Sequence, residues 1–166
     1  VAHLKSIVDN PKARKLQQTP VPVLGGVAVF FGIVLGIALA STYVSCTSLM
    51  TIVAAMMIML YTGTMDDLLD LSALLRFAVE IGVVMLLIYA NDISINNFNG
   101  LWGVGVIPDT LAIPLTIFAS VGIINAINMI DGVNGLSSGY CIMASIAFGS
   151  LFYASDNVSM LILAAV

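Results

Sequence analysis

The chain has 166 residues, of which 60% are hydrophobic and 8% charged, with a formal net charge of −4. A mean hydropathy of +1.11, and apolar runs as long as the roughly 20 residues that cross a bilayer, exclude a soluble domain of this size. Closed β-barrels alternate apolar and polar residues, which these runs do not, so the sequence predicts membrane-spanning helices.

The first segment of the chain, residues 1–21, is basic and rich in proline. It holds four of the five Lys and Arg residues. Since Lys and Arg concentrate on the cytoplasmic side of membrane proteins, we interpret residues 1–21 as a cytoplasmic loop. Its cations could bind lipid head groups or a diphosphate, or could serve as the cytoplasmic anchor alone.

Residues 22–166 are expected to form a helical bundle that is part of a larger single catalytic domain. The fold class predicted is an all-α polytopic integral membrane protein, with five complete transmembrane helices and the start of a sixth. The spans are Pro22–Val44, Ser48–Met65, Ala73–Ala90, Leu111–Ile130 and Leu136–Tyr153, with the sixth beginning near Val158. Counting from a cytoplasmic start places loops 66–72 and 131–136 in the cytoplasm.

The second polar feature in chain order is an acid pair in "MDDLLDL", Asp66 and Asp67. A carboxylate toward the bilayer centre costs about 2.5–3.5 kcal/mol, so these acids should face water or a partner. They could bind Mg²⁺ or supply a general base. The alternative is a solvated pair of loop acids that ends a helix.

The residues after the acid pair are expected to start the next helix. The pattern "DLS" before an apolar run places Asp70 or Ser72 near its N-terminal cap. Arg76, one turn further, could pair with the acids or with a substrate phosphate.

Residues 91–110 fall outside in this count and contain no Lys or Arg. The alternation of Ile93 and Ile95, the turn signal Asn99-Gly100 and the amphipathic Trp102 predict a short hairpin on the outer surface. No catalytic role is expected there. The two cysteines, Cys46 and Cys141, are expected to be buried free thiols.

The densest polar cluster is "NAINMIDGVNGL", residues 125–136. Asn125, Asn128 and Asp131 recur at every third position and spread over roughly 120° of one helix face. Gly132 then ends the helix, and Asn134 begins a second glycine turn. Such amides and glycines suit a sugar nucleotide or diphosphate. Polar contact between helices is the alternative.

These segments resemble the polyprenyl-phosphate N-acetylhexosamine-1-phosphate transferases, in the undecaprenyl-phosphate GlcNAc-1-phosphate transferase-like branch of glycosyltransferase family 4. The resemblance rests on "DNPKARK" with "TPVPVLGG", on "MDDLLDLSALLR" and above all on "NAINMIDGVNGL". It implies transfer of a sugar 1-phosphate from a UDP-N-acetylhexosamine to undecaprenyl phosphate at the cytoplasmic face, with release of UMP. Such a step initiates O-antigen, teichoic acid or capsule synthesis.

The resemblance also implies roles for particular residues, with Mg²⁺, or Mn²⁺ in its place, as cofactor. The implied catalytic residues are Asp66, Asp67 and Asp131. The implied substrate-binding residues are Asn125, Asn128, Asn134, Arg76 and Lys15. The implied metal ligands are Asp67 and Asp131. Which member of the acid pair acts as base and which binds metal stays open.

Some residues depart from the family pattern. Asn134 replaces a common Asp, Gln17 and Gln18 stand where His and a basic residue are frequent, and Val23 replaces a frequent Arg. These changes concern sugar specificity and phosphate contacts. The chain begins without Met and ends in an apolar run, so we expect a fragment that is inactive alone, with a Gly-Asp-x-Gly-Ser motif and a His-containing loop beyond it.

Other functions fit the sequence less well. A phospho-MurNAc-pentapeptide transferase is the nearest alternative, and an ion-coupled transporter or a purely structural membrane subunit are more remote. The expected location is the bacterial inner membrane. The expected partners are the lipid bilayer and the two substrates, with a homodimer as one oligomeric alternative and no nucleic acid.

Overall fold

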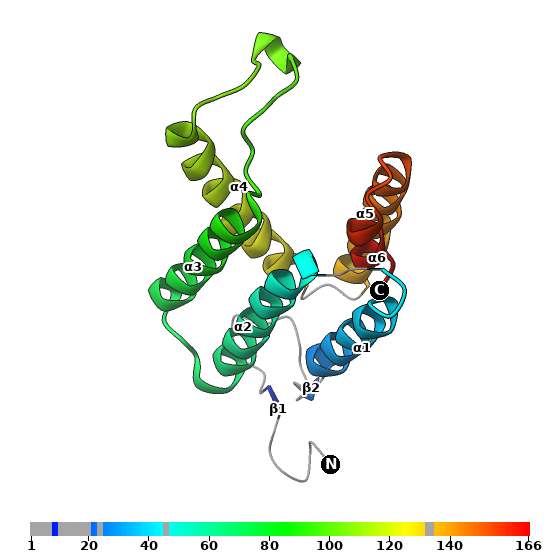
Figure 1. Cartoon of the computed structure of the whole chain (residues 1–166). Coiled ribbons are helices and arrows are strands. Elements are labelled where there is room, and N and C mark those ends of the chain that lie inside the picture. The colour runs from blue at the N-terminus through cyan, green and yellow to red at the C-terminus, as the bar shows by residue number, and fades with distance from the viewer. Residues whose placement is uncertain (1–7, 10–20, 23–24, 45–46, 132–134) are drawn as a thin grey trace.

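The computed structural model describes residues 8–9, 21–22, 25–44, 47–131 and 135–166. Within them the fold is helical apart from two short strands and a hairpin (Figure 1). The elements are β1 (Val8–Asp9), β2 (Val21–Pro22), α1 (Gly25–Ala40), α2 (Thr47–Leu69), α3 (Ala73–Asn91), η2 (Leu101–Gly103), α4 (Asp109–Ile130), α5 (Leu136–Ala154) and α6 (Val158–Ala165). Strands β1 and β2 pair antiparallel, with Val8 opposite Pro22.

Four of the described helices, α2 to α5, are long and apolar enough to cross a membrane. They correspond to the second through fifth predicted spans, and α6 begins at the predicted Val158. The all-α, multi-span fold class is therefore confirmed.

Two predicted boundaries differ from the structure. Helix α1 has 16 residues instead of a span from Pro22 to Val44, which makes it about 24 Å long at 1.5 Å per residue. After Ala40 the backbone tightens into turns, in which the Thr42 amide donates to the Leu39 carbonyl at 3.3 Å and the Tyr43 amide to the Ala40 carbonyl at 3.0 Å. Helix α2 continues to Leu69, so the acid pair predicted in loop 66–72 lies in its last turn.

The helices form two groups that meet along α2. Helices α2, α3 and α4 pack in sequence, while α1, α5 and α6 pack on the other side (Figure 1). Ile37 of α1 and Leu49 of α2 form a buried core with α6. At Gly36, a Cβ atom would lie 2.6 Å from Val166 Cγ1, so this glycine permits close approach of the chain after α6.

Large apolar side chains cover much of the outer surface. Phe118 is 78% exposed and Ile146 is 68% exposed, and α5 has no buried residue. Contiguous apolar surface on this scale is unfavourable in water but suits the hydrocarbon of a bilayer.

The predicted hairpin is confirmed. The Phe98 amide donates to the Gly105 carbonyl at 3.1 Å, and the Ile107 amide donates to the Asn96 carbonyl at 2.8 Å. The hairpin projects from the end of the bundle where α3 ends and α4 begins (Figure 1). Trp102 at its tip is 85% exposed.

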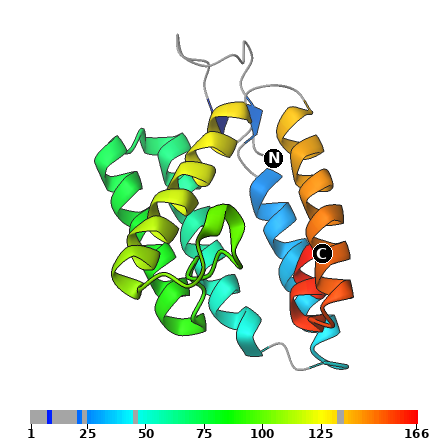
Figure 2. The same cartoon turned by 90° about the horizontal axis from the view of Figure 1, so that it is seen from above.

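The opposite end of the bundle gathers the ends of α2 and α4 and the starts of α1, α3 and α5 (Figure 2). We call it the site end. It follows from the antiparallel order of the helices, and it is where most of the predicted site residues lie.

Candidate functional site

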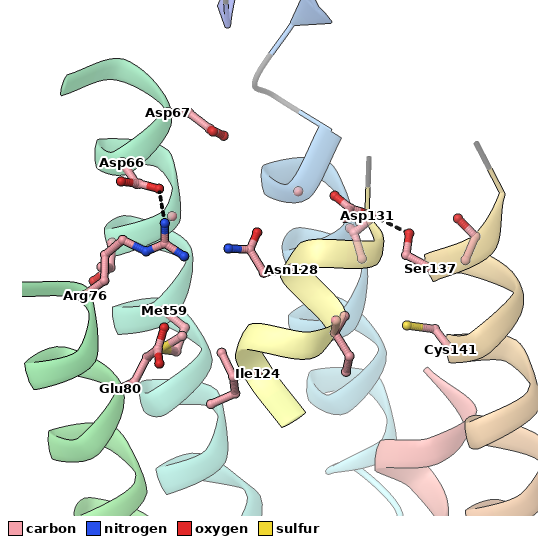
Figure 3. Close-up of a pocket in the computed structure, with 16 residues that line it drawn as sticks. Met59, Asp66, Asp67, Arg76, Glu80, Ile124, Asn128, Asp131, Ser137 and Cys141 are labelled. Carbon is pink, nitrogen blue, oxygen red and sulfur yellow. Dashed lines mark hydrogen bonds and ion pairs between the residues drawn. The ribbon is translucent and has the colours of Figure 1, made fainter. Parts of the chain in front are cut away.

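A cavity of about 620 Å³ opens at the site end, between α1, α2, α3, α4 and α5 (Figure 3). Its volume is in the range of small-molecule sites. It is lined by Gly26, Val29, Met59, Thr62, Gly63, Asp66, Asp67, Arg76, Glu80, Ile124, Ile127, Asn128, Asp131, Ser137, Ser138 and Cys141.

The acid pair enters the cavity from the last turn of α2. Arg76 Nη1 donates to Asp66 Oδ2 at 3.0 Å, and both side chains are about a quarter exposed. The sequence allowed Arg76 to pair with the acids or with a substrate phosphate, and in the structure it pairs with Asp66. Asp67 lines the cavity beside this ion pair (Figure 3).

Arg76 reaches Asp66 because α3 starts after a tight turn. Ser72 is the N-cap of α3, and its hydroxyl oxygen accepts a hydrogen bond from the Leu75 amide at 3.3 Å. Asp70 adopts a left-handed conformation, with φ of 52°, where α2 ends. Of the two cap candidates, Ser72 is confirmed, and it sets Arg76 one turn into α3.

The three polar residues at the end of α4 divide between two environments. Asn128 and Asp131 line the cavity, and Asn125 is not among its lining residues. The Asn125 Nδ2 atom donates to Glu80 Oε2 at 2.5 Å and to the Val121 carbonyl at 2.9 Å. Asn125 therefore makes a polar contact between helices, which is the alternative that the sequence left open for this motif.

Glu80 borders the cavity and was missed from the sequence. It lies two turns into α3 and is 4% exposed. The available signal was a lone carboxylate in the middle of an apolar span, because such residues are costly in a membrane and commonly mark functional sites.

The start of α5 supplies a further partner that sequence reasoning missed. Ser137 Oγ donates to Asp131 Oδ1 at 2.5 Å, which joins α5 to the end of α4 (Figure 3). Cys141, one turn further, is a free thiol, but it is exposed and lines the cavity. The expectation of a buried Cys141 is therefore wrong, because α5 turns this residue toward the cavity.

Several predicted residues lie outside the described part of the chain. They include the substrate-binding candidates Lys15 and Asn134, the turn residue Gly132, Cys46, and the departures from the family pattern at Gln17, Gln18 and Val23.

The cavity is rich in negative charge. Its described lining carries four carboxylates and one guanidinium, that of Arg76. A ligand with phosphate groups would be repelled by this set unless further positive charge accompanied it. The basic segment 1–21 and a divalent cation are two sources of that charge.

The donor set fits Mg²⁺ when substrate phosphates share the ion. Among the described residues, no group of three His, Cys, Asp or Glu side chains is close enough to hold a metal by itself. Mg²⁺ commonly binds through one or two carboxylates, with water and phosphate oxygens completing its shell. Asp67 and Asp131 are two carboxylates that line the same cavity.

The sequence matches the model of glycosyl transferase family 4 over residues 48–166. The fold and the site define a multi-pass membrane protein, and the chain belongs to this family. No solved structure matches the chain.

Three bacterial relatives illustrate the similarity. The chain is 34% identical to the undecaprenyl-phosphate alpha-N-acetylglucosaminyl 1-phosphate transferase of Salmonella typhi over 93% of its length and 42% of the relative's. It is 30% identical to the Escherichia coli K12 protein of the same name, over 98% of the chain and 44% of that relative. It is 29% identical to the "Probable undecaprenyl-phosphate N-acetylglucosaminyl 1-phosphate transferase" of Bacillus subtilis, over 96% of the chain and 44% of that relative. The chain thus spans less than half the length of these relatives.

Proposed function

We propose that the whole protein transfers N-acetylglucosamine 1-phosphate, or another N-acetylhexosamine 1-phosphate, from a UDP-sugar to undecaprenyl phosphate and releases UMP. The family membership and the names of the three relatives support this reaction. In a bacterium the reaction would begin assembly of a cell-envelope polysaccharide.

One observation carries the proposal. Asp66 and Asp67 at the end of α2 share a single cavity with Asn128 and Asp131 at the end of α4. Phosphoryl transfer depends mainly on positioning and on neutralising charge, for which carboxylates, an amide and a guanidinium in one cavity are suitable.

Charge distribution supports a cytoplasmic site in the inner membrane. The basic segment 1–21 precedes α1, whose start lies at the site end, and Arg76 lies there as well. No Lys or Arg follows Arg76 in the sequence, so the hairpin end has none. By the positive-inside rule, this distribution supports a site end that faces the cytoplasm.

The side chains divide into three proposed roles. Asp67 and Asp131 would hold Mg²⁺ together with the substrate phosphates, and the ion would neutralise charge on the transferred phosphoryl group. Asp66 orients the Arg76 guanidinium, which would bind a phosphate of the donor. Asn128 would donate and accept hydrogen bonds with the nucleotide sugar.

The test is UMP release by the purified full-length protein given UDP-GlcNAc, undecaprenyl phosphate and Mg²⁺. Asp67→Asn should lower turnover by about a hundredfold or more, because the cation that neutralises the reacting phosphates would lose one of its two carboxylate ligands. Asp92→Asn is the matched control, since Asp92 lies at the hairpin end with φ of 51°, a conformation that Asn tolerates. The control should keep full turnover.

Normal turnover in Asp67→Asn would remove this residue from the site. UDP-MurNAc-pentapeptide offered in the same assay tests the nearest alternative, and a preference for it would replace the proposed donor.

A further inference from the structure

Glu80 is the single glutamate of the chain, and its side chain is among the most buried polar groups of the described residues. Its side chain borders the cavity one turn deeper than Arg76 (Figure 3). A carboxylate in such a place is costly unless it is hydrogen-bonded, so its partner is informative.

That partner is held in a single orientation. The Asn125 amide nitrogen donates to Glu80 Oε2 and to the Val121 carbonyl of its own helix. An amide group has two N–H donors, and these two contacts occupy both. The pair therefore fixes the face of α4 that carries Asn125 against α3.

Helix geometry links this contact to the cavity. With about 100° per residue, each step of three residues turns the side-chain direction by about 60° and advances about 4.5 Å. Asn125 faces α3. One step of three residues further along α4, Asn128 faces the cavity, and a second step brings Asp131 to its contact with Ser137 of α5. Rotation of α4 about its axis would move Asn128 and Asp131 together.

We propose that Glu80 is a positioning residue: as hydrogen-bond acceptor for Asn125, it sets the rotation of α4 that directs Asn128 and Asp131 into the cavity. Its hydrogen-bond partner among the described residues is a neutral amide, so the position requires an acceptor atom more than a negative charge. The expected effect on turnover rests on the function proposed above.

Four variants of the full-length protein separate these roles. Glu80→Gln keeps an acceptor oxygen, whereas Glu80→Leu removes it. Asn125→Asp brings two carboxylates together, and combining it with Glu80→Gln restores one amide and one carboxylate with the direction of the hydrogen bond reversed.

Glu80→Leu and Asn125→Asp should each lower kcat/KM for UDP-GlcNAc by about tenfold or more, the scale of a buried polar group left without its partner. The kcat/KM of Glu80→Gln should be about fivefold higher than that of Glu80→Leu. The kcat/KM of the combined variant should be higher than that of Asn125→Asp by a similar factor. Recovery by an exchange of partners is not expected from two independent structural defects.

Thr116→Val is the matched control, because it removes a buried hydrogen-bonding hydroxyl from α4 at the opposite end of the helix. It should leave kcat/KM for UDP-GlcNAc unchanged. The proposal would be overturned if Glu80→Gln lowered kcat/KM as much as Glu80→Leu does. It would also be overturned if the combined variant had no higher kcat/KM than Asn125→Asp.

A second readout distinguishes this proposal from the proposed function. If the full-length protein releases no UMP, thermal unfolding of the same variants in detergent still measures the contact. The combined variant should recover the melting temperature lost in Asn125→Asp. Additive losses in melting temperature would overturn the pairing whatever the reaction.

Discussion

At the residue scale, polar side chains at the site end join neighbouring helices in pairs. Each pair combines a carboxylate with a donor from the next helix in sequence, so α2, α3, α4 and α5 are connected in turn. The pairs are Asp66 with Arg76, Glu80 with Asn125, and Asp131 with Ser137. Such interhelical hydrogen bonds fix how neighbouring helices are oriented, and the contact of Glu80, which is buried, is the least accessible to water of the three.

Arg76 is the residue for which this pairing makes a direct prediction. Arg76→Gln should raise KM for UDP-GlcNAc by about tenfold, because the phosphates lose a charge-assisted contact. Arg76→Lys should recover part of the loss, since it keeps the charge without the planar fork. Initial rates of UMP release over a range of donor concentrations measure both variants.

An unchanged KM in Arg76→Gln would mean that Arg76 serves Asp66 alone. A melting temperature measured on the same preparations separates loss of the phosphate contact from loss of the fold.

The residue roles were only partly predictable. The acid pair, Asn128 and Asp131 stood out because charge and amide groups are rare in apolar runs, and the structure brings them to one cavity. The contact of Asn125 with Glu80 was not predictable, because helical periodicity gives the angle between side chains on one helix but not which neighbouring helix they face. Ser137 was missed for the same reason.

At the element scale, hydropathy located the helices well and their ends less well. Length and apolarity predicted α2 to α5. The pattern "DLS" predicted the cap of α3 at Asp70 or Ser72, and the structure has it at Ser72. The extension of α2 to Leu69 was missed, because a bilayer-length criterion stops at the first charged residue although the helix can continue into water. The early end of α1 lies within an apolar run, where hydropathy does not register a change of the backbone from helix to turn.

The hairpin is tied to the bundle by one contact that can be tested. Thr116 Oγ1 accepts from the Ile95 amide at 2.8 Å and donates to the Ala112 carbonyl at 2.7 Å, and Thr116 is 5% exposed. Thr116→Val should lower stability by about 1–2 kcal/mol, because the Ile95 amide loses its acceptor.

Amide hydrogen exchange measures this effect locally. Exchange at Ile95 should accelerate in Thr116→Val, while exchange in α5 should stay as in the unmodified protein. Equal protection at Ile95 would show that this hydrogen bond does not hold the hairpin.

At the scale of the whole molecule, the antiparallel order of the helices separates two ends with different chemistry. The hairpin end presents exposed apolar groups such as Trp102. The site end holds the cavity with its four carboxylates and Arg76, together with the start of α1. Two motifs about 60 residues apart in sequence thereby reach one cavity. The proposed reaction requires that residues of α2 and α4 bind the same ligand.

Isothermal titration of UDP-GlcNAc into the full-length protein with Mg²⁺ tests that dependence most directly, using Asp67→Asn, Asp131→Asn and the double variant. Each single change should weaken binding by about tenfold or more, and the double variant should be little weaker than the worse single variant, because both carboxylates serve one bound ion and its phosphates. Losses that multiply independently, or normal binding in either single variant, would contradict a shared site.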